Sequence, residues 1–179
     1  MSDPIESARA ARPVAMGATL VALAAALLLS GCAGLMREAP PPGAPLPEVL
    51  AKLGQPTEVY REPDGGQDLE YRGQPMGQFQ WIARIGPDGR LLAYEQVLTS
   101  AAFAKVRVDH TGRDEILRMF GRPAEISRVR FHDYEVWSYR YKEAGVWNSM
   151  MSIHFDQDGV VRQMLNGPDP LYDDRFRRD

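Results

Sequence analysis

The spacing of apolar residues predicts three short helices along the chain. Over residues 46–53 the apolar side chains recur at i, i+3, i+4 and i+7, so they share one face of a helix. A similar pattern predicts helices over 111–120, with its first residue as the cap, and over 101–108. Gly54 and Gly121 follow two of these helices, and each is predicted to end its helix with a positive φ in left-handed geometry.

Elsewhere the apolar residues alternate with polar ones, which predicts β-strands. In three such segments, 78–85, 135–141 and 149–155, most apolar residues lie at odd positions, with Ile82 an exception in the first. Asp88-Gly89 and Asp158-Gly159 each separate two alternating runs, and Asp-Gly in that position is a hairpin signal. The side chains predicted to face the core are Phe79, Trp81, Ala83, Ile85, Trp137, Tyr139, Tyr141, Met151, Ile153 and Phe155.

These elements occur twice. Leu53-Gly54-Gln55-Pro56 corresponds to Phe120-Gly121-Arg122-Pro123, and two later motifs recur in the same order, 67 to 70 residues apart. We therefore predict two tandem modules, residues 46–99 and 100–167. The predicted fold class is α+β, with the short helices of each module packed on one face of a three- to four-stranded antiparallel sheet.

The chain begins with a pattern typical of a secretory signal. The 16 residues 14–29 are uncharged and mostly apolar, which is shorter than the ~20 residues of a membrane-spanning helix. We predict that residues 1–31 are removed. Leu29-Ser30-Gly31-Cys32 resembles the lipobox of bacterial lipoproteins, in which the cysteine is acylated. Cys32 is the only cysteine, so an internal disulfide is excluded, and the alternative is a buried cysteine in an anchor helix.

Composition predicts two segments outside the modules and argues against one class of partner. The prolines of residues 32–45 predict an extended tether, and residues 168–179 are predicted to form a mobile tail. The formal net charge is −3, with the two signs interspersed, which argues against a nucleic-acid partner.

No motif in the sequence indicates catalysis. His110, His132 and His154 form no ligand pair, and an acylated Cys32 leaves no free thiol. We therefore predict no enzyme activity, no metal and no cofactor. A partner is expected on the sheet faces opposite the core, although these faces equally fit ordinary solvated surface. The residues predicted for this binding face are Gln80, Ile82, Arg84, Arg140, Met150 and His154.

The same motifs resemble a known family. A short helix ending in Leu/Phe-Gly-x-Pro, then Trp137-x-Tyr139, then a strand closing in Asp158-Gly159-x-Val161, all behind a lipobox, resembles the SmpA/OmlA (BamE-type) lipoproteins. In tandem, such modules are similar to the β-lactamase inhibitory protein architecture. The first copy departs from the motif, because it has Leu69 where the family has tryptophan.

The resemblance implies a non-enzymatic lipoprotein anchored in the outer membrane through Cys32 and facing the periplasm. It implies binding to another envelope protein, such as the β-barrel assembly machinery, as an accessory in outer-membrane protein assembly or envelope integrity. The alternative function is a periplasmic inhibitor or ligand-binding module similar to the β-lactamase inhibitors.

Overall fold

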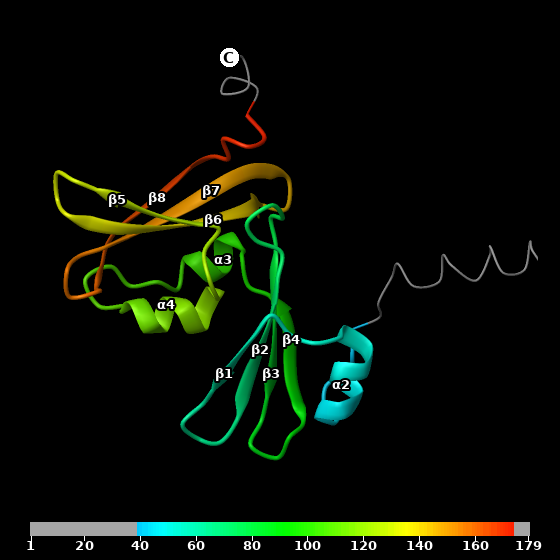
Figure 1. The fold of residues 1–179 in the computed structure, drawn as a ribbon. Coiled ribbons are helices and arrows are strands. Elements are labelled where there is room, and N and C mark those ends of the chain that lie inside the picture. Colours follow the sequence, from blue (N-terminus) through cyan, green and yellow to red (C-terminus); the bar gives the residue numbers. More distant parts are fainter. Residues whose placement is uncertain (1–38, 174–179) are drawn as a thin grey trace, which may run out of the picture. The chain divides into compact units, whose positions relative to one another are not determined.

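The computed structural model describes residues 39–173, which fold into two four-stranded antiparallel sheets (Figure 1). The first sheet has the order β1-β2-β3-β4 and the second the order β5-β6-β7-β8. The elements are α2 (Leu46–Leu53), β1 (Glu58–Arg61), β2 (Gln67–Arg72), β3 (Gln80–Ile85), β4 (Leu91–Gln96), α3 (Ser100–Phe103), α4 (Arg113–Phe120), β5 (Glu125–Val129), β6 (Tyr134–Glu143), β7 (Trp147–Phe155) and β8 (Val161–Pro168).

The predicted α+β class is wrong, because the described chain is mostly β and only 15% helical. A strand, β1 or β5, follows each Gly-x-Pro motif, where no strand was predicted. The helix predicted over 101–108 is only Ser100–Phe103, and the side chain of Thr99 caps it. Thr111 does not cap α4 either, since its side chain is buried and accepts a hydrogen bond from the Arg107 amide.

The two glycines at the helix ends have similar conformations. Gly54 has φ 83° and Gly121 has φ 70°, so the predicted positive φ is confirmed at both. Their ψ angles, −169° and −163°, are extended rather than left-handed helical. This combination is accessible almost only to glycine. Each amide still closes its helix by donating to the carbonyl four residues earlier, Leu50 or Leu117.

The buried apolar side chains form two clusters. In the first, Val49 and Leu53 of α2 join residues of β2, β3 and β4, including Leu69 and Ala83. In the second, Ile116 and Phe120 of α4 join aromatic and aliphatic residues of the second sheet. Ile82 of β3 belongs to this second cluster although its neighbour Ala83 belongs to the first. The two faces of β3 therefore contribute to different cores.

Two segments that were predicted to lie free are partly ordered. At the end of the proline-rich tether, the Gly43 amide donates to Leu91 O at 2.7 Å, and Ala44 is buried. At the other end of the chain, Pro168 closes β8 and Asp169 is fully buried. The tether and tail are thus shorter than predicted. Residues 32–38 of the tether, residues 174–179 of the tail, and the whole predicted signal and lipobox lie outside the described residues.

Candidate functional site

The sheet face predicted to bind a partner is largely buried in the first half of the chain. Gln80 and Ile82 are both fully buried. The Gln80 amide donates to the carbonyl of Phe120, the last residue of α4, and Ile82 packs in the core around that helix. Gln80 and Ile82 therefore cannot form a binding face, because the second half of the chain covers them.

The two arginines predicted for that face are engaged in ion pairs. Arg84 contacts Asp68 at 2.5 Å and Glu95 at 3.0 Å. Burial raises the pKa of Asp68, while Arg84 opposes that shift. Arg140 pairs with the fully buried carboxylate of Asp169. Both guanidinium groups thus hold the fold together rather than standing free on a surface.

The remaining predicted residues lie on β7 and are also shielded. Met150 is half-buried, and His154 is buried. Burial lowers the pKa of the His154 imidazole, because its charged form loses hydration. The six residues predicted for the binding face are therefore split between two sheets and do not form one exposed surface.

A buried carboxylate lies where α4 ends against the first sheet. Glu70 is fully buried and accepts hydrogen bonds from Tyr60 Oη at 2.7 Å, Arg72 Nε at 2.8 Å and the Arg122 amide at 3.3 Å. Burial and the bond to Glu70 raise the pKa of Tyr60. Every donor is supplied by the protein, so the cluster acts as a structural joint between the two halves.

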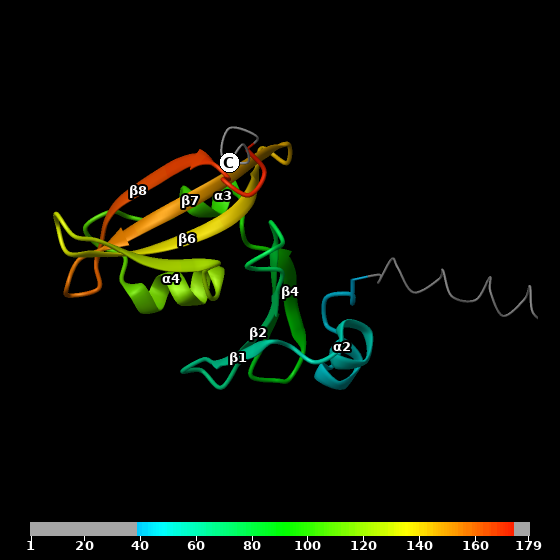
Figure 2. The same ribbon diagram turned by 45° about the horizontal axis from the view of Figure 1, so that its top comes forward.

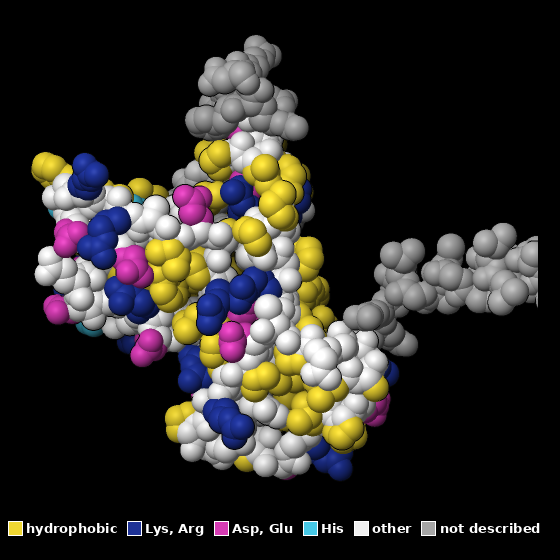
Figure 3. Space-filling view, viewed as in Figure 1, with side chains coloured by type: hydrophobic (Ala, Val, Ile, Leu, Met, Phe, Trp, Pro, Cys, Tyr) yellow, Lys and Arg dark blue, Asp and Glu magenta, His cyan; other side chains and the backbone are white. Residues whose placement is uncertain are grey.

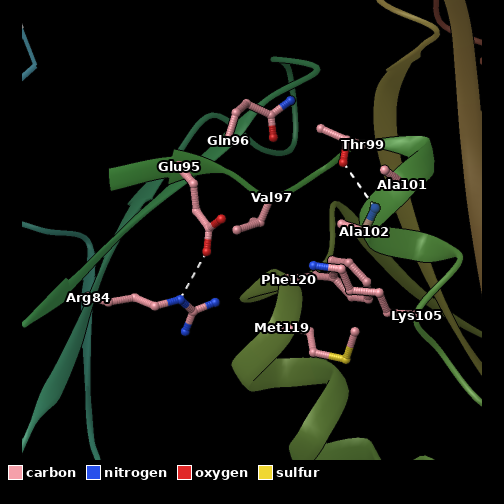
Figure 4. Close-up of a pocket in the computed structure, with 10 residues that line it drawn as sticks. All are labelled: Arg84, Glu95, Gln96, Val97, Thr99, Ala101, Ala102, Lys105, Met119 and Phe120. Carbon is pink, nitrogen blue, oxygen red and sulfur yellow. Dashed lines mark hydrogen bonds and ion pairs between the residues drawn. The ribbon is translucent and has the colours of Figure 1, made fainter. Parts of the chain in front are cut away.

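A pocket of about 230 Å³ opens between β3, β4 and the helices α3 and α4 (Figure 4). Val97, Met119 and Phe120 give it an apolar wall, and Figure 4 shows Arg84 turned toward Glu95 at one side. The lining contains no pair of groups arranged as nucleophile and base. The pocket is large enough for one side chain or a small molecule, and we assign no chemistry to it.

An exposed apolar surface lies where three separate segments meet. The loop between β2 and β3, the turn between β6 and β7, and the residues after β8 come together in both views of the ribbon (Figures 1 and 2). Figure 3 shows hydrophobic side chains gathered at this end of the second sheet. We call this surface the apolar patch, and its residues, 36% to 70% exposed, are Met76, Phe79, Val146, Trp147, Leu171 and Tyr172. Phe79 was predicted to face the core, so that prediction is wrong.

Polar contacts, several of them made by the buried Asp169, hold the three segments together. The Asp169 carboxylate accepts from Gln78 Nε2 at 3.2 Å and pairs with Arg140. The Asp169 amide donates to the Asn148 carbonyl at 3.0 Å, next to Trp147. Tyr172 Oη donates to the carbonyl of Met76 at 3.1 Å. The patch is therefore a shaped surface on supported loops, and no sequence signal pointed to it, because its parts are distant in the chain.

The described residues show neither a metal site nor a membrane-spanning helix. Within residues 39–173, His, Cys, Asp and Glu side chains do not gather in any group of three that could hold a metal ion. Likewise, no helix in this part of the chain has the length and hydropathy needed to cross a membrane.

No family model matches the chain, and no curated protein matches it. Among solved structures, it is similar to a DUF4309 family protein (YjgB) from Bacillus subtilis, with 13% sequence identity and a TM-score of 0.29. That alignment covers 70% of this chain and 79% of the Bacillus protein. A likeness this weak carries no argument about fold or function.

Proposed function

We propose that this chain is a lipid-anchored protein of the bacterial envelope that binds another protein through the apolar patch. The anchor is proposed from Leu29-Ser30-Gly31-Cys32, with acylation at Cys32, the only cysteine. The protein-binding role is proposed from one observation, the gathering of six large apolar side chains on supported loops. The proposed role is that of a non-enzymatic accessory in outer-membrane protein assembly or envelope integrity.

The composition of the patch supports a protein partner. Single exposed apolar residues are common, but a group from three segments is typical of an interaction surface. Trp147, Tyr172 and Met76 are residue types enriched in protein interfaces. Because the Asp169 network already orders the loops, binding would cost little additional conformational entropy.

A single substitution tests whether the partner binds at the apolar patch rather than elsewhere on the surface. We expect Trp147→Asp to reduce recovery of the partner from detergent-solubilised membranes by at least tenfold, since truncating an interface tryptophan typically weakens binding that much. Leu92→Asp is the matched control, because Leu92 is 64% exposed, close to the 70% of Trp147, and lies on β4 of the first sheet. The measurement is quantitative mass spectrometry of co-purified proteins, alongside a thermal melt of each variant. Equal recovery with both variants would contradict the proposed patch.

The anchor has a separate test. Cys32→Ser should abolish labelling by a fatty-acid analogue and leave an uncleaved or soluble precursor. Labelling of the Cys32→Ser protein at the wild-type level would show that this residue is not the attachment site.

A further inference from the structure

The two halves of the chain are alike in detail around one tyrosine in each. Tyr71 Oη donates to the carbonyl of Gly54 at 3.2 Å, and Tyr139 Oη donates to the carbonyl of Gly121 at 3.0 Å. Each tyrosine therefore lies on the helix side of its sheet and contacts the end of the helix. Tyr139 is fully buried, whereas Tyr71 is only half-buried. The difference points to an element that covers the tyrosine in the second half.

The covering element of the second half is α3, through its Phe103. This side chain is 2% exposed, and its ring centroid lies 4.6 Å from that of Phe120, 6.2 Å from Tyr139 and 5.0 Å from Tyr141. Within residues 39–173, no helix precedes α2. At the repeat spacing of 67, the residues that correspond to α3 are 33–36, which lie outside the described residues. In the described part of the chain, the first half thus has the counterpart of the Phe103 site without a counterpart of Phe103.

Aromatic rings line this surface of the first half, as they line the Phe103 site. Gly73 stands where the second half has a tyrosine, and a Cβ built on Gly73 would lie 2.6 Å from a ring carbon of Phe79. The Phe79 ring therefore takes the place of that tyrosine. On the same side of the sheet, Tyr71 meets Tyr94 edge to face at 6.3 Å, and Tyr94 stacks on Trp81 at 4.8 Å. We call this surface the aromatic site, and its residues are Tyr71, Phe79, Trp81 and Tyr94.

We propose that the aromatic site takes an aromatic side chain carried on one helical turn of the protein partner, as the second half takes Phe103. This inference rests on the proposed function and names the part of the partner that is recognised. Phe79 belongs to both the aromatic site and the apolar patch, so the two surfaces adjoin and one partner can contact both. Aromatic rings attract one another beyond the effect of buried area, which favours an aromatic occupant. Residues 33–36, Ala-Gly-Leu-Met, contain no aromatic side chain, so the proposal assigns the site to another chain.

The test uses the full-length protein in detergent and a peptide that copies the occupant of the second half. The peptide is Thr-Ser-Ala-Ala-Phe-Ala-Lys-Val, the sequence of residues 99–106, and the control peptide has alanine in place of phenylalanine. Binding is followed by NMR titration of amide signals, because a single helical turn is unstable on its own and binds weakly. We expect the phenylalanine peptide to shift the signals of residues 71–81 and 93–95. The alanine peptide should bind about tenfold more weakly, since it lacks the anchoring ring.

Matched variants locate the site and separate it from the apolar patch. Trp81→Asp should weaken binding of the phenylalanine peptide by about tenfold or more and lower recovery of the partner from detergent-solubilised membranes. Leu92→Asp, at a 64% exposed position of β4, should change neither. Trp147→Asp should lower partner recovery and leave peptide binding unchanged, so failure of the aromatic site and failure of the apolar patch are distinguishable. A thermal melt checks each variant, and Phe79→Asp, at a 48% exposed position, replaces Trp81→Asp if that variant does not fold.

Several results would overturn the proposal. Equal binding of the two peptides, or shifts confined to the second core, would show that the aromatic site does not take the phenylalanine. Tighter peptide binding by the full-length chain with Leu35→Asp and Met36→Asp would show that the chain's own residues compete for the site. Self-association of the wild type that Trp81→Asp abolishes would make a second copy of the chain the occupant.

Discussion

Gly121→Ala offers a sharp test of how the two halves of the chain join. Gly121 has φ +70°, and a Cβ built there would overlap Gln80 Nε2 and lie 2.6 Å from Glu70 Oε2. Both neighbours are fully buried, so neither can swing into solvent to relieve the clash. The substitution should therefore disturb the backbone of the helix end and the buried joint together.

Three contributions set the magnitude. Holding a residue other than glycine in this backbone region costs about 1–3 kcal/mol. Forcing an extra methyl group into a packed site costs about 1–3 kcal/mol. Losing the hydrogen bond from Gln80 to the Phe120 carbonyl would leave a buried polar group unsatisfied, at about 1–3 kcal/mol. Because partial relaxation reduces the sum, we expect a loss of about 3–6 kcal/mol, a large fraction of a typical domain's stability.

Gly89→Ala is the matched control. Gly89 has φ +73°, almost the same as Gly121, but no atom lies within 4 Å of its added Cβ. It should therefore cost only the backbone contribution, about 1–3 kcal/mol. Urea unfolding of the wild type and both variants, followed by far-UV circular dichroism, measures the difference. Equal destabilisation by the two substitutions would refute the idea that the joint at Gly121 is tightly packed.

Three further predictions concern stability. Trp137→Ala should lower the free energy of unfolding by about 3–5 kcal/mol in urea titration, because the ring is buried in the second core. Burial lowers the pKa of His154 in the folded state, so the folded protein binds fewer protons than the unfolded chain just below pH 6.5. The free energy of unfolding should therefore be highest above pH 6.5 and decline as pH falls through the lowered pKa. Unfolding titrations of His154→Gln should lack this decline. Asp169→Ala should cost about 3–5 kcal/mol and weaken the protection of the Asn148–Tyr172 region in hydrogen exchange, since Arg140 loses its buried partner.

The features that depend on local sequence were predictable. A glycine ends each of the two eight-residue helices because the conformation required there excludes a Cβ, and the Gly-x-Pro motif marks both positions. The Asp-Gly turns likewise place Gly89 and Gly159 at positive φ between strands. These signals act through a few neighbouring residues, so the linear chain contains all the information they need.

The orientation of β3 was not predictable by the same reasoning. Alternation identifies the buried face only when the other face is in water. In β3, Ala83 enters the first core and Ile82 the second, while Gln80 is buried against the Phe120 carbonyl. Because Gln80 is polar and lies in an alternating strand, the pattern wrongly predicted that its side chain faces solvent. The α+β prediction failed partly because it missed the strands β1 and β5. Both are short, so they become evident only through their pairing with β2 and β6.

The sequence alone determined where the two eight-residue helices end and where the Asp-Gly turns lie. It also contains the lipobox pattern that predicts an anchor at Cys32. Only the tertiary structure decided which surfaces are available for binding. The apolar patch unites Met76, Trp147 and Tyr172, which are far apart in the chain and meet because the buried carboxylate of Asp169 ties their segments together. Exposure is a property of what packs against a residue, and such long-range packing leaves no periodic trace in the sequence.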